Sequence, residues 1–275
     1  MRTGRLLGAG RTADVYEIHD DERESGRTGR DGPGGTGGLG GSDGAWVLRR
    51  YRDGWGDAAA EAEVMEYVRG HGYPVPRVRS ATRTEMVLER LSGPTMVEAF
   101  AAGLLDPAQA GAILARLLHD LHALPPRLPR DLHALPPRNH AVSQPGGSGP
   151  ATPTALPRVL HLDLHPENVI VTPHGPQVID WNNAEEGPPG LDWGVSAMIL
   201  AQVVVDTADS RADMAHATLA SLLAHQPDGP SALTDEGLVE AARRRAANPT
   251  MTAREVELIG DAEELIRCLA GSRMT

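Results

Sequence analysis

The chain reads HLDLHPEN over residues 161–168 and VIDW over residues 178–181. These stretches place an acid at Asp163, an amide at Asn168 and a second acid at Asp180. The residues between Asn168 and Asp180 are two short β-branched runs on either side of a turn that contains Pro and Gly. The sequence therefore predicts a β-hairpin with polar side chains at its open end.

The hairpin suggests a metal site. The midpoint of positions 168 and 180 lies inside the turn, so we expect antiparallel pairing to set Asn168 opposite Asp180. Directly opposed Cβ atoms are about 5 Å apart, a spacing at which an amide oxygen and a carboxylate can share one Mg²⁺ ion. Asp163 would then lie on the loop that enters the site and accept a proton from an attacking hydroxyl. This is the arrangement of a phosphoryl-transfer site.

These residues resemble the aminoglycoside phosphotransferase and choline kinase-like family, whose members share the protein-kinase fold. The family motif H-x-D-x-x-x-x-N matches His161, Asp163 and Asn168, and its metal-binding Asp matches Asp180. The resemblance is most specific over residues 158–200. It implies that Asp163 is the catalytic residue and that Asn168 and Asp180 are the metal ligands.

The resemblance also implies the fold and the cofactors. We expect an α+β, two-lobed, protein-kinase-like fold with a small N-terminal β-sheet lobe that carries one helix and a larger, mainly helical C-terminal lobe. Residues 1–91 form the first lobe in this prediction and residues 92–275 the second. The expected cofactors are ATP and Mg²⁺, and a buried structural acid is expected at Asp192.

Nucleotide-binding candidates follow from the same register. A glycine-rich turn with Gly8, Gly10 and Ala13 resembles the phosphate-covering turn of the family, because small residues let backbone N–H groups approach phosphates. The pattern is weak alone, since the chain has 31 glycines. Glu89 and Leu91 resemble the hinge whose backbone groups bind adenine.

The run WVLRRY over residues 46–51 predicts a strand. By family register, Arg49 is the cation that binds ATP phosphates, with Arg50 as the second choice. The usual residue there is Lys, but this chain contains no lysine, and Arg offers a planar fork where Lys offers a compact ammonium. A pair of exposed Arg side chains on an edge strand is the alternative interpretation.

A helix is predicted from the N-cap Asp57 to about Gly70. Glu61 shares its apolar stripe, whereas Glu63 falls on the opposite face. A buried acid needs a partner, and we expect Arg49 to supply it. The apolar members of the stripe are Val64, Met65 and Val68.

Other interpretations of the central motif stay open. His161, Asp163 and His165 alternate, so on a strand they would share one face and could bind a transition metal such as Zn²⁺ in a hydrolase. The segment could also be a surface loop without chemistry, and His165 alone suits a structural role. A third alternative is a catalytically weak nucleotide-binding regulatory module, a pseudokinase, suggested by Arg in place of Lys.

Composition restricts the partners. A net charge of −11 argues against a nucleic-acid partner. The same charge is compatible with a cationic small-molecule acceptor of the phosphoryl group, although a solvated acidic surface explains it equally well. The lone Cys268 excludes an intramolecular disulfide and a multi-Cys zinc site. Without a membrane-spanning run or a signal-peptide core, we expect a cytoplasmic protein with no membrane partner.

Two segments are predicted to be insertions. Residues 19–44 are charged and then glycine-dense, so they cannot bury enough apolar surface to offset their chain entropy and are expected to be disordered. Residues 128–157 are rich in Pro and Gly and are expected to be flexible. They include a verbatim second copy of the eight residues DLHALPPR, which begin first at Asp120. This duplication explains His122 and His133 better than metal binding does.

Overall fold

The computed structural model describes most of the chain, and the described residues form two compact units. The predicted insertions 19–44 and 128–157 lie outside the described residues, apart from His19 and Pro157. The described ranges are 2–10, 12–19, 45–52, 56–127, 157–229 and 231–271. The first unit comprises Met1–Thr95 and Glu167–Asn182, and the second comprises Met96–Pro166 and Asn183–Thr275.

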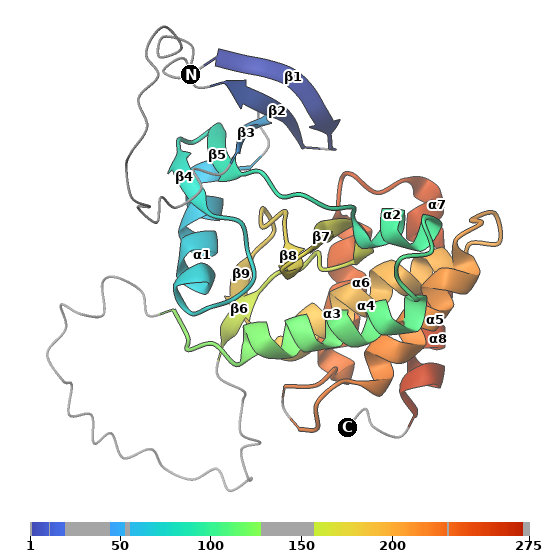
Figure 1. Cartoon of the computed structure of the whole chain (residues 1–275). Helices are drawn as coiled ribbons and strands as arrows, with labels where there is room; N and C mark the ends of the chain where they lie inside the picture. The colour runs from blue at the N-terminus through green and yellow to red at the C-terminus, as the bar shows by residue number, and fades with distance from the viewer. Residues whose placement is uncertain are drawn as a thin grey trace, which may run out of the picture. The chain divides into compact units, whose positions relative to one another are not determined.

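An antiparallel sheet of five strands, in the order β1-β2-β3-β5-β4, forms most of the first unit (Figure 1). The central strand β3 pairs Arg49 with Val15 on one side and with Met86 on the other. The helix α1 packs on β4 and β5. The strands are β1 (Arg2–Ala9), β2 (Ala13–His19), β3 (Trp46–Tyr51), β4 (Val78–Ala81) and β5 (Glu85–Glu89).

The helix α1 (Ala58–Gly70) begins and ends where the sequence predicts. The side chain of Asp57 accepts hydrogen bonds from the backbone N–H groups of Ala59 and Ala60, which satisfies two of the donors that a helix start leaves open. Glu61 lies on the buried stripe and Glu63 is exposed, as predicted. The helix thus carries an acid into the core of the first unit.

The predicted hairpin consists of β7 (Val169–Thr172) and β8 (Gly175–Val178), and it belongs to the first unit. Its backbone is bonded to the chain that follows β5: the N–H of Val171 donates to the carbonyl of Pro94 at 2.8 Å. Gly93 permits this approach. It has φ +150, and a Cβ there would lie 2.0 Å from the Val171 carbonyl oxygen.

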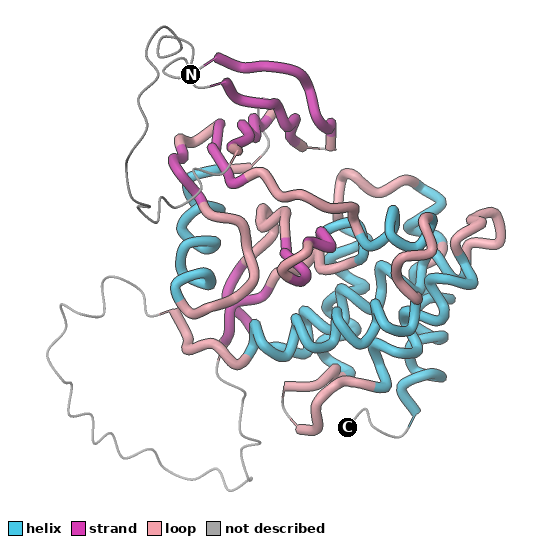
Figure 2. The backbone as a smooth tube through the Cα atoms, viewed as in Figure 1, coloured by secondary structure: helices cyan, strands magenta, loops and turns pink. Residues whose placement is uncertain are grey.

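The second unit is mainly helical (Figure 2). The helix α4 packs against α5, α6 and α8 and is buried around most of its circumference, in agreement with its nearly continuous apolar sequence. A short antiparallel pair, β6 (Arg158–Leu160) with β9 (Glu185–Gly187), completes the unit. The helices are α2 (Met96–Ala101), α3 (Pro107–His122), α4 (Pro189–Val205), α5 (Ala212–Ala224), α6 (Asp235–Ala247), α7 (Ala253–Glu257) and α8 (Ile259–Ala270).

This element order confirms the predicted α+β class: a sheet unit with α1 and a mainly helical unit. Residues 253–270 form two consecutive helices, α7 and α8, separated at Leu258. None of the helices in the described ranges combines the length and the apolar composition that a membrane crossing requires.

Candidate functional site

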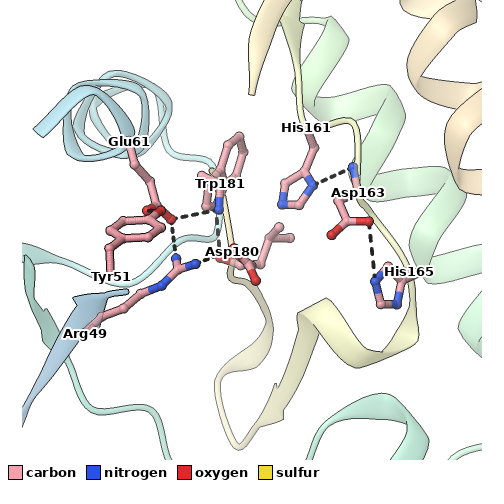
Figure 3. Close-up of polar contacts among 9 residues, drawn as sticks. Arg49, Tyr51, Glu61, His161, Asp163, His165, Asp180 and Trp181 are labelled. Carbon is pink, nitrogen blue, oxygen red and sulfur yellow. Dashed lines mark hydrogen bonds and ion pairs between the residues drawn. The ribbon is translucent and has the colours of Figure 1, made fainter. Parts of the chain in front are cut away.

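Arg49 is the buried cation of the first unit. Its side chain is 8% exposed and reaches two carboxylates: Nη1 donates to Oε1 of Glu61, and Nη2 donates to Oδ1 of Asp180 at 2.5 Å (Figure 3). Arg50 alternates to the other face of β3 and binds the exposed Glu85, with 2.6 Å between Nε and Oε1. The strand register therefore favours Arg49 over Arg50 as the phosphate-binding cation, a role that stays a prediction.

Glu61 accepts hydrogen bonds from three residues, two of them on β3 and one on the chain that follows β8. Its Oε1 accepts from Nη1 of Arg49 and, at 2.9 Å, from the backbone N–H of Trp181; its Oε2 accepts from the hydroxyl of Tyr51. The predicted ion pair between Arg49 and Glu61 is thereby confirmed. Because Trp181 follows Asp180, Glu61 connects α1 both to β3 and to the chain that carries Asp180.

Burial and neighbouring charges shift the pKa values of Arg49 and Glu61 in opposite directions. Burial alone would lower the pKa of Arg49, but the carboxylates of Glu61 and Asp180 outweigh it and hold that pKa above its ordinary value. Burial raises the pKa of Glu61, and Arg49 and Tyr51 oppose that rise only in part. Arg49 therefore stays charged between its two acidic partners.

The register of the hairpin differs from the prediction. Val169 pairs with Val178, and the N–H of Ile179 donates to the carbonyl of Asn168 at 3.0 Å, so the predicted direct opposition of Asn168 and Asp180 is wrong by one residue. The reason is a two-residue turn, whereas the expected pairing centred on position 174 needs an odd number of turn residues. Both polar residues still lie at the open end of the hairpin.

Asp180 has a left-handed backbone, with φ +66. This conformation costs an ordinary residue about 1–2 kcal/mol, although Asp tolerates it better than most. Two contacts hold it there: Arg49 binds its carboxylate, and the following N–H, that of Trp181, donates to Glu61. Strained residues held by their surroundings cluster at functional sites, so this observation favours a functional acid at position 180.

Asn168 and Asp180 have the donor chemistry that Mg²⁺ prefers. One supplies an amide oxygen and the other a carboxylate whose side chain remains 34% exposed despite its bond to Arg49. Across the described ranges, His, Cys, Asp and Glu side chains do not gather in groups of three or more that could hold a metal ion. Mg²⁺ commonly binds one or two carboxylates and completes its shell with water and substrate phosphates. The residues present therefore fit this ion.

The nucleotide-binding candidates also belong to the first unit. Gly8 lies within β1 and pairs with Val15, so the glycine-rich turn is shorter than the sequence suggests. The N–H of Gly10 donates to the carbonyl of Ala13 at 2.9 Å, and Ala13 begins β2. Glu89 is the last residue of β5, and Leu91 lies two residues beyond it. Their contacts with a nucleotide remain predictions.

The loop that carries Asp163 belongs to the second unit and is held by Asp192. This acid is fully buried in the first turn of α4. Its Oδ2 lies 3.0 Å from Nε2 of His122 and accepts the backbone N–H of His161 at 2.9 Å, while its Oδ1 accepts the N–H of Leu162 at 2.7 Å. Asp192 thus confirms the expected buried structural acid.

The bonds to Asp192 stabilise an unusual backbone. Leu162 has φ +59, which is rare for a bulky residue. Burial alone would raise the pKa of Asp192, but the hydrogen bonds from His122 and from the N–H of His161 hold that pKa below its usual value. An ionised acid therefore fixes the turn immediately before Asp163.

Asp163 is partly exposed on this loop. Its N–H donates to Nδ1 of the buried His161 at 3.2 Å, and its Oδ1 lies 3.7 Å from Nε2 of His165 (Figure 3). Its side chain is 29% exposed. The alternative in which His161, Asp163 and His165 share one face of a strand is wrong. The strand β6 ends at Leu160, and these three residues lie on the loop that contains the left-handed Leu162.

Two residues of this machinery were missed from the sequence. Tyr51 stands two residues after Arg49 and so shares its face of β3, a signal that could have identified it. His122 was attributed to the duplication, yet it is buried and bonded to Asp192. Its position near the end of a Leu-rich stripe gave no indication of that partner.

A family model described as "Phosphotransferase enzyme family" matches residues 36–145 and 149–217, more than half of the chain. A search of curated proteins found no match. An amicoumacin kinase in complex with AMP-PNP, Ca²⁺ and Ami is similar at 13% identity and a TM-score of 0.49, covering 96% of this chain and 87% of that one. An ethanolamine kinase from Plasmodium vivax is similar at 12% identity and a TM-score of 0.48, covering 96% and 74%.

Proposed function

The chain belongs to the phosphotransferase enzyme family, and from that premise we propose that it transfers the γ-phosphoryl group of ATP to a hydroxyl of a small molecule. The observation that carries the proposal is the bridge from the buried Glu61 through the buried Arg49 to the partly exposed Asp180. In kinases of this type, an ion pair between a β-strand cation and a helix acid positions the phosphates, and an Asp holds the metal.

Each residue of the bridge has a role in the proposal. Arg49 would bind the phosphates, and Glu61 would hold Arg49 in place. Asn168 and Asp180 would hold Mg²⁺, which supplies neutralisation of the charge on the phosphate oxygens when bound. The turn that contains Gly10 would cover the phosphates with its N–H groups.

Asp163 would act as the general base. It would accept the proton of the acceptor hydroxyl as the hydroxyl oxygen forms a bond to the γ-phosphorus. The bond between that phosphorus and the β–γ bridging oxygen would break, and ADP would leave with the bonding electrons. Support comes from the motif, which places Asp163 five residues before Asn168, and from the buried Asp192, which orients the loop.

We propose an aminoglycoside-like compound, an amino alcohol or a related metabolite as the acceptor. The net charge of −11 is consistent with a cationic acceptor. Two acids of β9 in the second unit already pair with arginines, Glu185 with Arg244 and Glu186 with Arg127. Other side chains of this unit would therefore have to recognise a cationic acceptor.

The direct test is a screen of hydroxyl-bearing acceptors with the purified full chain, ATP and Mg²⁺, in which ADP release is followed. Mass spectrometry of the acceptor should show one added phosphoryl group. EDTA should abolish the reaction, and Asp163→Asn is the matched inactive control. ADP release that proceeds equally without acceptor, with EDTA and in the Asp163→Asn variant would contradict the proposal.

A nucleotide-binding module with weak catalysis is the second candidate. It is favoured because Arg49 binds Oδ1 of Asp180, the acid proposed to bind the metal. An arginine that does not release Asp180 would lower turnover while still binding phosphates. Calorimetric binding of ATP in Mg²⁺, together with the absence of phosphorylated product across a broad acceptor panel, would favour this candidate over the enzyme.

A further inference from the structure

Tyr51 is the third donor to the Glu61 carboxylate. It lies on the same face of β3 as Arg49 and is 5% exposed. Its hydroxyl donates to Oε2 of Glu61, and its ring lies beside the guanidinium of Arg49, with 5.1 Å from Cζ to the ring centroid (Figure 3). A single side chain therefore contacts both members of the ion pair.

The two oxygens of Glu61 have different partners. Oε1 accepts hydrogen bonds from Nη1 of Arg49 and from the backbone N–H of Trp181. Oε2 accepts a hydrogen bond from the Tyr51 hydroxyl. A carboxylate bound through one oxygen can rotate about its last torsion, which is a broad one. A donor on the second oxygen fixes the carboxylate plane, and with it the direction in which Oε1 meets its donors.

The Tyr51 ring packs against Gly56, whose missing Cβ leaves room for it. Gly56 has φ +70, and a Cβ at that position would lie 2.5 Å from Cε1 of Tyr51. Burial and the neighbouring Glu61 raise the pKa of Tyr51, so the hydroxyl keeps the proton that it donates. The ring position and the donor state are therefore both well determined.

We propose that Tyr51 is a positioning residue for phosphoryl transfer: by fixing the Glu61 carboxylate, it orients Arg49 toward ATP phosphates and, through the Trp181 N–H, orients Asp180 toward the metal. This inference rests on the proposed function, since it concerns the same site. It adds a residue and a route of action that the roles proposed above for the motif residues do not require.

A buried tyrosine can also be a mere core residue, and Tyr51→Phe separates the two roles because it keeps the ring and removes only the hydroxyl. We expect a Michaelis constant for MgATP raised by about tenfold, the ratio that one lost hydrogen bond to a charged group produces. The Michaelis constant for the acceptor should not change. Calorimetric titration of MgATP without acceptor should show the same weakening.

Tyr16 offers a matched control. Its ring lies beside the exposed Arg50, with 5.5 Å from Cζ to the centroid, in the same kind of pair that Tyr51 forms with Arg49. Tyr16→Phe should leave MgATP binding unchanged. If Tyr51→Phe behaves like Tyr16→Phe in the titration, the proposal is overturned. If the parent protein itself does not bind MgATP, the proposed function fails, which is a distinct result.

A double variant tests the route through Glu61. If Tyr51 acts on the nucleotide by way of that carboxylate, Tyr51→Phe should weaken MgATP binding no further in a Glu61→Gln background. Fully additive losses would overturn the route. Should Tyr51→Phe fail to fold, Gly56→Ala replaces it, because the added Cβ displaces the ring and leaves the hydroxyl. It should also weaken MgATP binding, and unchanged binding with a displaced ring would count against the proposal.

Discussion

Arg49 binds the carboxylate of Asp180 directly, with 2.5 Å between Nη2 and Oδ1, while its other terminal nitrogen binds Glu61. The two residues of the short contact are 131 positions apart in the chain. A lysine ammonium is a point donor, whereas the guanidinium is a planar fork that can serve two carboxylates at once. The bridge is therefore a property of arginine at this position.

Two replacements of Arg49 should show how much of its effect comes from its positive charge and how much from the shape of the guanidinium. Arg49→Ala should raise the Michaelis constant for ATP or lower turnover, and should cost about 3–5 kcal/mol of unfolding free energy, because it leaves the buried Glu61 without its cation. Arg49→Lys should keep appreciable activity, since the charge remains. Urea unfolding and steady-state kinetics give both quantities.

Two controls accompany these variants. Arg50→Ala should have little effect, because Arg50 and Glu85 form an exposed pair. The double variant Arg49→Ala/Glu61→Ala should cost much less than the sum of the single changes. Strictly additive losses, with Arg50→Ala the more damaging change, would assign the phosphate-binding role to Arg50.

Asp163→Asn should abolish most phosphotransfer and leave ATP binding nearly unchanged. A general base acts on the acceptor proton and is typically worth about 10²–10⁴-fold in rate. Single-turnover kinetics and calorimetric titration of ATP measure the two effects separately. A variant with full activity would remove Asp163 from the mechanism.

The metal ligands should differ in importance. Asp180→Ala should weaken Mg²⁺-dependent ATP binding more than Asn168→Ala, because a carboxylate contributes a full charge to a hard cation. Titrations of ATP at several Mg²⁺ concentrations check this order. Binding by the parent protein that does not depend on Mg²⁺ would rule out the two-ligand site.

The buried Asp192 predicts a pH-dependent stability. The pKa of this acid is depressed in the folded state, so its contribution is fully present above the unfolded value of about 3.9 and is lost as the pH falls through the folded pKa. Asp192→Asn should therefore be less stable than the parent by several kcal/mol at pH 7. The difference in unfolding free energy between the parent and Asp192→Asn should become smaller only below about pH 4.

Urea unfolding at neutral and acidic pH measures this gap. Asp228→Asn, a change to an exposed acid of the same unit, is the control and should alter stability by less than about 0.5 kcal/mol. A gap between parent and Asp192→Asn that is equally large well below pH 3 would show that the loss does not come from the ionised carboxylate.

Local periodicity made several features readable from the sequence. The spacing of Glu61 within an apolar stripe predicted its burial, and the cap at Asp57 predicted the start of α1. The choice of Arg49 over Arg50 came from the family register. The resemblance seen in the motif around Asp163 is confirmed by the family match. Such features depend on residues a few positions apart, whose relative directions a helix or strand determines by itself.

Contacts across long stretches of chain needed the tertiary structure. Nothing near Arg49 in sequence indicates that its second partner is Asp180, and nothing near His122 indicates Asp192. The hairpin register depended on a turn shorter by one residue than its composition suggested. The left-handed backbone of Asp180 is held by residues from β3 and α1. These relationships arise where packed elements meet, so short-range pattern cannot specify them, whereas packing and the pairing of buried charges do.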